Sequence, residues 1–317
     1  MIRLLIILIF MSNTACARVK KEPTMTNNLT GINQLWNFSN PEETRGKFEQ
    51  LLVEQSETAP LDYILQIKTQ IARTYSLTAK FEEAHSVLDE VEPQLSAETP
   101  VAKVRYLLER GRTFNSNNEK SKATELFVQA YNYGREVEAY IYSVDAAHMV
   151  GISSATLDDK LEWNQKGLEE AEKSNDQNVR RWIGVFYNNM GWDLFEAKHY
   201  TEALAKFELC RDFYQELEAN DRLGIAKWSI AKTYRYLGRN SEALAIQMAL
   251  LAEKDGTDES GYTYEELGEL YLLKGETEKA KTYFSKAHEI LSKDVWLEKN
   301  EPERLHRLLR LTAESSQ

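Results

Sequence analysis

Apolar and small residues recur at fixed offsets along most of the chain and predict a succession of paired helices. In residues 187–207 (YNNMGWDLFEAKHYTEALAKF) such residues occupy the positions of Tyr187, Met190, Gly191, Leu194, Ala203 and Phe207. Residues 264–284 (YEELGELYLLKGETEKAKTYF) place apolar or small residues at the same offsets. Spacings of three and four are typical of one face of an α-helix. Each stretch therefore predicts two helices joined by a turn.

The same frame fits residues 68–88, 107–127 and 227–247, and a degenerate copy lies around Ala146 and Ala147. Glycine or alanine at the small positions lets two helices approach closely, and the large residue of the second helix fills the space beside them. One helix pair cannot bury its apolar face alone. The chain is therefore expected to stack about six such pairs.

This frame resembles the W-x2-LG-x2-Y…A-x3-F pattern of the tetratricopeptide repeat (TPR) family over roughly residues 60–292. The resemblance implies an all-α fold, a right-handed α-solenoid of about six TPR-like helix-turn-helix repeats with capping helices at 41–56 and 301–314. Successive anchors Ala84, Ala123, Ala203, Ala243 and Ala280 are 39, 80, 40 and 37 residues apart. The family period is about 34 residues, so a longer-period array is expected. HEAT-type repeats, with a period of about 40–47, are the alternative fold.

The chain begins with an apolar run from Leu4 to Met11 that follows Arg3. The run is too short to span a bilayer and has the length of a signal-peptide core. Residues 1–17 are therefore interpreted as a signal peptide, residues 18–40 as a polar linker, and residues 41–317 as the helical solenoid. An apolar start on a cytoplasmic protein remains an alternative.

Two kinds of processing are open at the end of this segment. Thr14-Ala15-Cys16 resembles the end of a bacterial lipobox, which would make Cys16 the site of lipidation. Ala15-Cys16-Ala17 would instead give an ordinary A-x-A cleavage site. The remaining cysteine, Cys210, lies at a small packing position of a second helix, which predicts a buried structural thiol.

Composition narrows the classes of function. Only 14 Gly and 6 Pro interrupt 317 residues, which favours helices over a turn-rich β fold. The net charge of −11 disfavours nucleic acid as a partner. The sequence contains no HExxH, G-x-S-x-G, GxxxxGK[ST] or GxGxxG motif. No enzymatic activity, metal or cofactor is therefore expected.

Candidate binding residues come from the TPR resemblance. In that family the first helix of each pair lines a concave groove, at positions six and three before and one and four after the small residue. Carried onto this sequence, these positions and the degenerate third repeat supply the candidate peptide-binding residues Arg73, Arg105, Arg112, His148, Asn188, Trp192, Phe195, Trp228, Lys232 and Arg235.

These residue types suit an extended polypeptide. Arginine forks bind carboxylates, aromatic rings serve as rigid anchors, and an asparagine amide bonds peptide backbone. The expected partner is therefore a protein or peptide, possibly with an acidic portion. Two alternatives stay open: Trp192 and Trp228 pack between repeats, and Arg105 and Arg112 pair with acids of adjacent helices.

The sequence thus predicts a non-catalytic peptide-binding TPR scaffold. With the amino-terminal signal, it is expected to be exported and associated with the envelope, in the periplasm or anchored to the outer membrane. The alternative is an intracellular TPR regulator that changes shape when a peptide binds.

Overall fold

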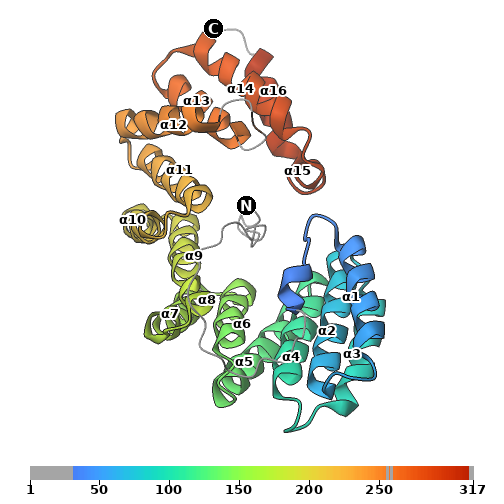
Figure 1. The fold of residues 1–317 in the computed structure, drawn as a ribbon. Helices are drawn as coiled ribbons and strands as arrows, with labels where there is room; N and C mark the ends of the chain where they lie inside the picture. The colour runs from blue at the N-terminus through green and yellow to red at the C-terminus, as the bar shows by residue number, and fades with distance from the viewer. Residues whose placement is uncertain (1–30, 255–256, 258–259, 314–317) are drawn as a thin grey trace. The chain divides into compact units, whose positions relative to one another are not determined.

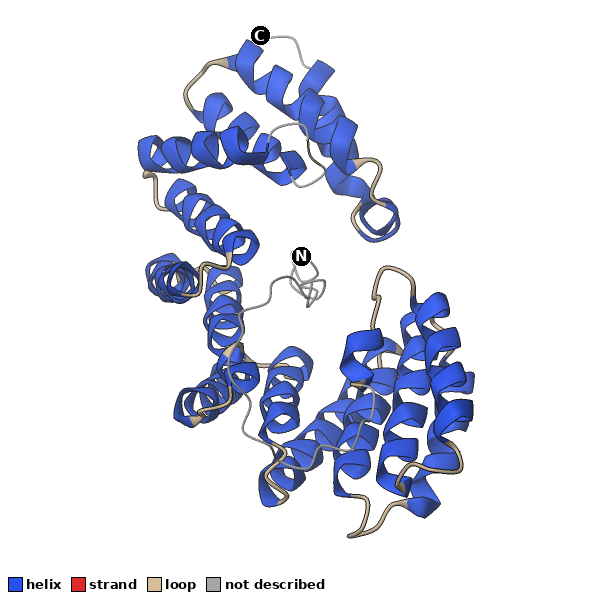
Figure 2. Cartoon of the chain, in the orientation of Figure 1, coloured by secondary structure: helices blue, strands red, loops and turns tan. Residues whose placement is uncertain are grey.

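The computed structural model describes residues 31–254, 257 and 260–313, and all regular structure in these residues is helical (Figures 1 and 2). A short 3-10 helix, η1 (Ile32–Leu35), precedes the α-helices. These are α1 (Pro41–Gln55), α2 (Leu61–Leu77), α3 (Phe81–Val91), α4 (Pro100–Ser116), α5 (Lys120–Glu136), α6 (Tyr140–Ser153), α7 (Leu157–Lys173), α8 (Gln177–Arg180), α9 (Trp182–Glu196), α10 (Tyr200–Glu216), α11 (Asn220–Tyr236), α12 (Asn240–Lys254), α13 (Ser260–Leu273), α14 (Thr277–Leu291), α15 (Val295–Asn300) and α16 (Pro302–Ala313).

The chain forms two compact units, residues 1–182 and residues 183–317. In the described part of the first unit, the pairs α2/α3, α4/α5 and α6/α7 follow one another. The second unit contains the pairs α9/α10, α11/α12 and α13/α14. The prediction of an all-α array of six TPR-like pairs is therefore confirmed. The connections within pairs are short, such as residues 197–199, so much of the longer period lies in the helices, which reach 17 residues.

The small and large residues of the repeated frame pack against each other within each helix pair. The side chain of Phe207 on α10 lies against Gly191 on α9, where an added Cβ would meet its ring at 2.5 Å. The equivalent approaches join Gly111 to Phe127 and Gly268 to Phe284. All three phenylalanines are fully buried. A small residue in the first helix is therefore required by the ring of the second.

Helix α1 caps the first repeat as expected. Asn40 accepts a hydrogen bond from the backbone N–H of Glu43 at 3.1 Å, and its own side-chain amide donates to the Glu43 carboxylate. This reciprocal contact fixes the start of the helix. Phe48 on α1 is buried in a cluster with Tyr63 and Ile67 of α2.

The predicted polar linker is wrong over its last part, because residues 31–40 are packed on the solenoid. Ile32 is buried in the same cluster as Phe48, and the indole N–H of Trp36 donates to the side-chain oxygen of Gln70 at 3.0 Å. This segment is held on the solenoid by aromatic and apolar side chains. Their spacing is too irregular to predict a helix. The predicted signal peptide, the lipidation site Cys16 and residues 18–30 lie outside the described residues.

Helix α16 closes the last repeat. Leu305 and Leu308 are buried against Phe284 and Leu291, whereas Leu309 is 52% exposed. Asn300 ends α15 and donates its side-chain amide to the Trp296 carbonyl at 2.9 Å. In the described part of the chain, no helix combines the length and apolar character that crossing a membrane requires.

Candidate functional site

The predicted binding residues lie on the first helices of the pairs, as the repeat frame requires, but they are divided between the two units. Arg73, Arg105, Arg112 and His148 lie on α2, α4 and α6 of the first unit. Asn188, Trp192, Phe195, Trp228, Lys232 and Arg235 lie on α9 and α11 of the second. The two sets are therefore two separate candidate surfaces.

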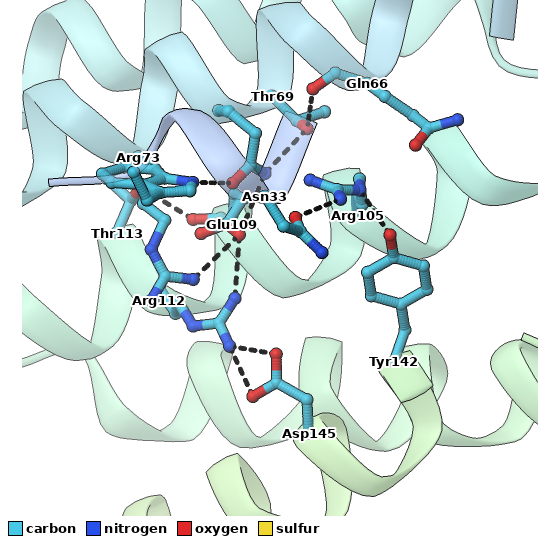
Figure 3. Close-up of polar contacts among 12 residues, drawn as sticks. Asn33, Gln66, Thr69, Arg73, Arg105, Glu109, Arg112, Thr113, Tyr142 and Asp145 are labelled. Carbon is cyan, nitrogen blue, oxygen red and sulfur yellow. Dashed lines mark hydrogen bonds and ion pairs between the residues drawn. The ribbon is translucent and has the colours of Figure 1, made fainter. Parts of the chain in front are cut away.

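In the first unit, the carboxylate of Glu109 binds two of the predicted arginines, Arg73 and Arg112. Its Oε1 accepts from Arg112 Nη1 at 2.8 Å, from Arg73 Nη1 at 3.2 Å and from Gln70 Nε2 at 3.4 Å. Figure 3 shows the side chains of Arg73, Glu109 and Arg112 pointing toward one another. Glu109 is buried, and its second oxygen has no hydrogen-bond partner within the described residues.

Arg112 also reaches the next repeat, where its Nη2 contacts both oxygens of Asp145 on α6 at 2.5 and 2.6 Å (Figure 3). Burial alone would raise the pKa of Asp145, but the adjacent Arg112 guanidinium outweighs burial and lowers it. Burial likewise opposes the charge of Arg112, yet Asp145 and Glu109 raise its pKa. These groups, with Gln70 and Arg73, form the Glu109 cluster.

Arg105 is 4% exposed, and among the described residues its hydrogen bonds go to neutral side chains. Its Nε donates to the Tyr142 hydroxyl at 2.9 Å, and its Nη2 donates to the side-chain oxygen of Asn33 at 2.7 Å (Figure 3). Its guanidinium also lies 4.9 Å from the centre of the Tyr142 ring. Both acceptors are neutral, so Arg105 is the cation of this face whose charge lacks a counter-ion among these contacts.

His148 lies on α6, three residues after Asp145. Burial lowers its pKa to about 4, and the nearby Arg112 adds to this effect while Asp145 opposes it. The imidazole is therefore neutral at physiological pH. Its ring centre is 5.4 Å from that of Trp182, which is a packing contact rather than an exposed binding position.

In the second unit, the predicted aromatic anchors pack against one another. The ring centre of Trp192 lies 5.3 Å from Phe195, 5.1 Å from Phe207 and 6.0 Å from Trp228. Phe195 continues the contacts to Tyr236 at 4.9 Å. Trp192 and Phe195 are each 5% exposed, so both rings are packed within this unit.

Lys232 and Arg235 converge on one buried carboxylate, that of Glu266 on α13. Lys232 Nζ lies 2.5 Å from Oε1, and Arg235 contacts both oxygens at 2.7 and 3.0 Å. Lys232 is only 5% exposed. Burial alone would raise the pKa of Glu266, but the two cations reverse that effect and lower it to about 2.

The same kind of pairing occurs at the carboxyl-terminal end. Arg304 on α16 contacts Glu265, and Arg307 contacts Glu269 at 2.5 Å. Two acidic residues of α13 are thus paired with arginines of the capping helix. Ion pairs between successive first helices and the cap are a general feature of both units.

On the first helices of the second unit, two buried N–H donors remain unpartnered within the described residues. These are Asn188 Nδ2 on α9 and Trp228 Nε1 on α11. Asn188 is 3% exposed and Trp228 is 8% exposed. Both stand three positions before the small residue of their repeat, Gly191 and Ala231. The structure therefore repeats a buried, unsatisfied donor at one position of consecutive repeats.

Sequence reasoning missed the acceptors that pair with the predicted cations. A signal for several of them exists, because a polar residue recurs two positions before the small residue of the first helix. This position holds buried Gln70, Glu109, Asn189, Ser229 and Glu266. A polar residue repeated inside a buried frame indicates hydrogen-bonded partners across repeats.

Cys210 is buried, its Sγ lies 3.4 Å from the Gly184 carbonyl oxygen, and burial raises the pKa of its thiol to about 12. Among the described residues, no trio of His, Cys, Asp or Glu is placed to hold a metal ion. A shallow hollow of about 380 Å³ beside α12 contains none of the predicted residues and is lined by Asn240, Ser241, Leu244, Ala245, Met248 and Lys274.

Comparison with known proteins supports the fold. No protein-family model matches the sequence, and the search of curated proteins gives no match. Among solved structures, apo RapI is similar with a TM-score of 0.67 at 16% identity, covering 83% of this chain and 76% of RapI. NprR in complex with its cognate peptide NprX gives 0.54 at 16% identity, with 89% and 81% covered.

A tetratricopeptide repeat protein from Parabacteroides merdae is also similar, with a TM-score of 0.51 at 17% identity, covering 89% of this chain and 97% of that protein. Identities this low establish shared architecture rather than shared activity. The helix pairs, the glycine–phenylalanine contacts within them and these structural relatives agree. The chain therefore has the fold of the tetratricopeptide-repeat proteins.

Proposed function

We propose that the chain is a non-catalytic scaffold whose first helices bind an extended peptide. The observation that carries this proposal is the pair of unpartnered donors, Asn188 Nδ2 and Trp228 Nε1, at the same position of successive repeats. A buried donor without a partner costs about 1–3 kcal/mol. An extended peptide presents carbonyl oxygens at regular spacing, so two of them suit two donors that recur with the repeat.

A structural relative supports the same class of ligand, since NprR was solved with its cognate peptide bound. The expectation that this peptide carries an acidic portion is less well supported. Arg112 is already held by Glu109 and Asp145, and Lys232 is held by Glu266. We therefore infer a ligand held mainly through its backbone carbonyls.

The double variant Asn188→Ala/Trp228→Phe tests this proposal. Removing two unsatisfied donors should leave thermal stability nearly unchanged, whereas affinity for a bound peptide should fall about tenfold or more, because each lost hydrogen bond contributes about 0.5–1.5 kcal/mol. The measurement is the Kd of peptides selected on the wild-type chain from a displayed library of random short peptides. Wild type and variant are then compared by fluorescence polarisation.

A matched control lies on α12, the second helix of the repeat that contains Trp228. Gln247 on α12 is also fully buried, and neither its Nε2 nor its Oε1 has a partner within the described residues. Gln247→Met removes a buried polar group away from the first-helix faces and should leave peptide affinity unchanged. The proposal fails if the double variant binds the selected peptides as tightly as the wild type.

We further propose that the chain is exported and associated with the envelope, on the basis of the apolar run Leu4–Met11 and of Cys16. The intracellular regulator remains the alternative, because the peptide-binding faces serve either location. Mass spectrometry of the amino terminus separates the two. We expect an acylated Cys16 or a mature chain that starts near Arg18, and a chain retaining Met1 would contradict export.

A further inference from the structure

Residues 31–38, here called the docked segment, cover part of the surface on which the repeat frame predicted ligand binding. The side-chain oxygen of Asn33 accepts from Arg105 at 2.7 Å, and the Trp36 indole donates to Gln70 at 3.0 Å. Figure 3 shows Asn33 lying between Arg105 and the Glu109 cluster. The chain thus places one of its own segments on the faces of α2 and α4.

Aromatic contacts complete the docking. The rings of Trp36 and Phe38 stack with centres 4.6 Å apart and an interplanar angle of 7°. The guanidinium of Arg73 lies 5.5 Å from the Trp36 ring and 5.4 Å from the Phe38 ring. A side-chain amide thus precedes an aromatic residue by three positions, and each engages a different first helix. The receiving residues are two predicted ligand-binding arginines and the neighbouring Gln70.

The docked segment is held shallowly. Ile32 is its one buried side chain, while Asn33 is exposed and Trp36 is half-buried. Its regular structure is the four-residue helix η1. At its end, the backbone N–H of Asn37 donates to the Thr44 hydroxyl at 3.0 Å, which ties the segment to α1. Apart from Ile32, the segment docks through exposed or half-buried side chains, so the part from Asn33 to Phe38 is suited to exchange.

The surface beneath the segment has its own support. Arg73 is held by Glu109 at 3.2 Å, and Arg105 is held by the Tyr142 hydroxyl at 2.9 Å. Neither bond involves the docked segment. These arginines therefore keep their positions when the segment leaves, and they present the same donors to another peptide.

We propose that residues 33–38 are an intramolecular substitute for a peptide partner on the first unit. The partner carries a side-chain amide three residues before a tryptophan, and it competes with the docked segment for Arg105, Gln70 and Arg73. This inference rests on the proposed peptide-binding function and adds a recognition pattern and a built-in competitor. A segment joined by a short linker has an effective concentration in the millimolar range, so the wild-type surface is largely occupied.

The test uses a fluorescent peptide of residues 31–40, GINQLWNFSN, and two full-length chains. One is the wild type, and the other is the variant Asn33→Ala/Trp36→Ala, which weakens the docked segment but keeps Ile32. We expect the variant to bind the peptide at least about tenfold more tightly than the wild type, because its internal competitor is weakened. Fluorescence polarisation gives both values of Kd.

Two controls make the outcome decisive. A peptide that itself carries Asn33→Ala and Trp36→Ala should bind neither chain, which shows that these two side chains carry recognition. Circular dichroism melting should show that the variant remains folded, as expected for one exposed and one half-buried position.

Equal affinity for both chains, or no binding to a folded variant, would overturn the inference and show that the docked segment is a permanent cap. Either outcome is distinguishable from failure of the proposed function. Peptide capture on the second unit is tested with Asn188 and Trp228, which lie on α9 and α11.

Discussion

Replacing Glu266 with glutamine should lower the free energy of unfolding by about 3–5 kcal/mol, as expected when one partner of a buried ion pair is removed. Glu266 is 1% exposed, and it is the carboxylate that holds Lys232 and Arg235. Without its charge, Lys232 remains buried with no counter-ion at this contact. Urea unfolding followed by far-UV circular dichroism measures the loss.

The pH dependence of stability gives a second measure of the same pair. The pKa of Glu266 falls from its ordinary 4.5 to about 2 on folding. A carboxyl with a lowered pKa stabilises the fold fully above pH 4.5, and this contribution of about 3 kcal/mol is lost as pH falls toward 2. Between these values, Glu266→Gln should lose stability less steeply than the wild type, so that the two curves converge.

An exposed ion pair of the same unit provides the control. Arg239 and Glu242 are close in the structure, but their side chains are 41% and 51% exposed. Glu242→Gln should leave the free energy of unfolding nearly unchanged, because water already solvates both charges. If the two glutamine variants lose equal stability, burial does not set the strength of the Glu266 pair.

Replacing Phe207 with alanine should also cost about 3–5 kcal/mol, the usual range for truncating a buried phenylalanine. Its ring is fully buried, contacts Trp192 at a centre distance of 5.1 Å and fills the space beside Gly191. Truncation leaves a cavity between α9 and α10. The free energy of unfolding in urea, with the wild type as reference, measures this cost.

A double-mutant cycle with Gly191 identifies the contact responsible. An added Cβ at Gly191 would lie 2.5 Å from the Phe207 ring, so Gly191→Ala alone should destabilise the chain by about 1–3 kcal/mol. In the Phe207→Ala background the new methyl group enters the cavity instead. The two changes should therefore cost less together than the sum of their separate effects. Strict additivity would show that the glycine is not required by the ring.

The sequence was most informative where structure depends on near neighbours. Gly191 and Phe207 are 16 residues apart and belong to one helix pair. Their offset survives in residues 111–127 and 268–284, so the helix pairs and their packing residues could be read from periodicity. The start of α1 was also predictable, because the contact between Asn40 and Glu43 spans only three residues.

The candidate site was less predictable, because its side chains choose partners across repeats. Lys232 and Glu266 are 34 residues apart, and Arg112 and Asp145 are 33 apart. Which acid meets which base depends on how successive first helices are aligned when they stack, and periodicity does not define that alignment. The sequence therefore located the faces but not whether each cation on them already had a partner.

The docked segment shows most clearly which features follow from the sequence and which depend on the tertiary structure. By itself the sequence determined the all-α repeat, the helix pairs and the small-residue contacts, because these follow from local helix geometry and steric fit. Tertiary structure alone decided that Asn33 reaches Arg105, 72 residues away, and that Trp36 reaches Gln70. The segment has no helical period of its own, so its position depends on a surface that exists only after α2 and α4 have stacked.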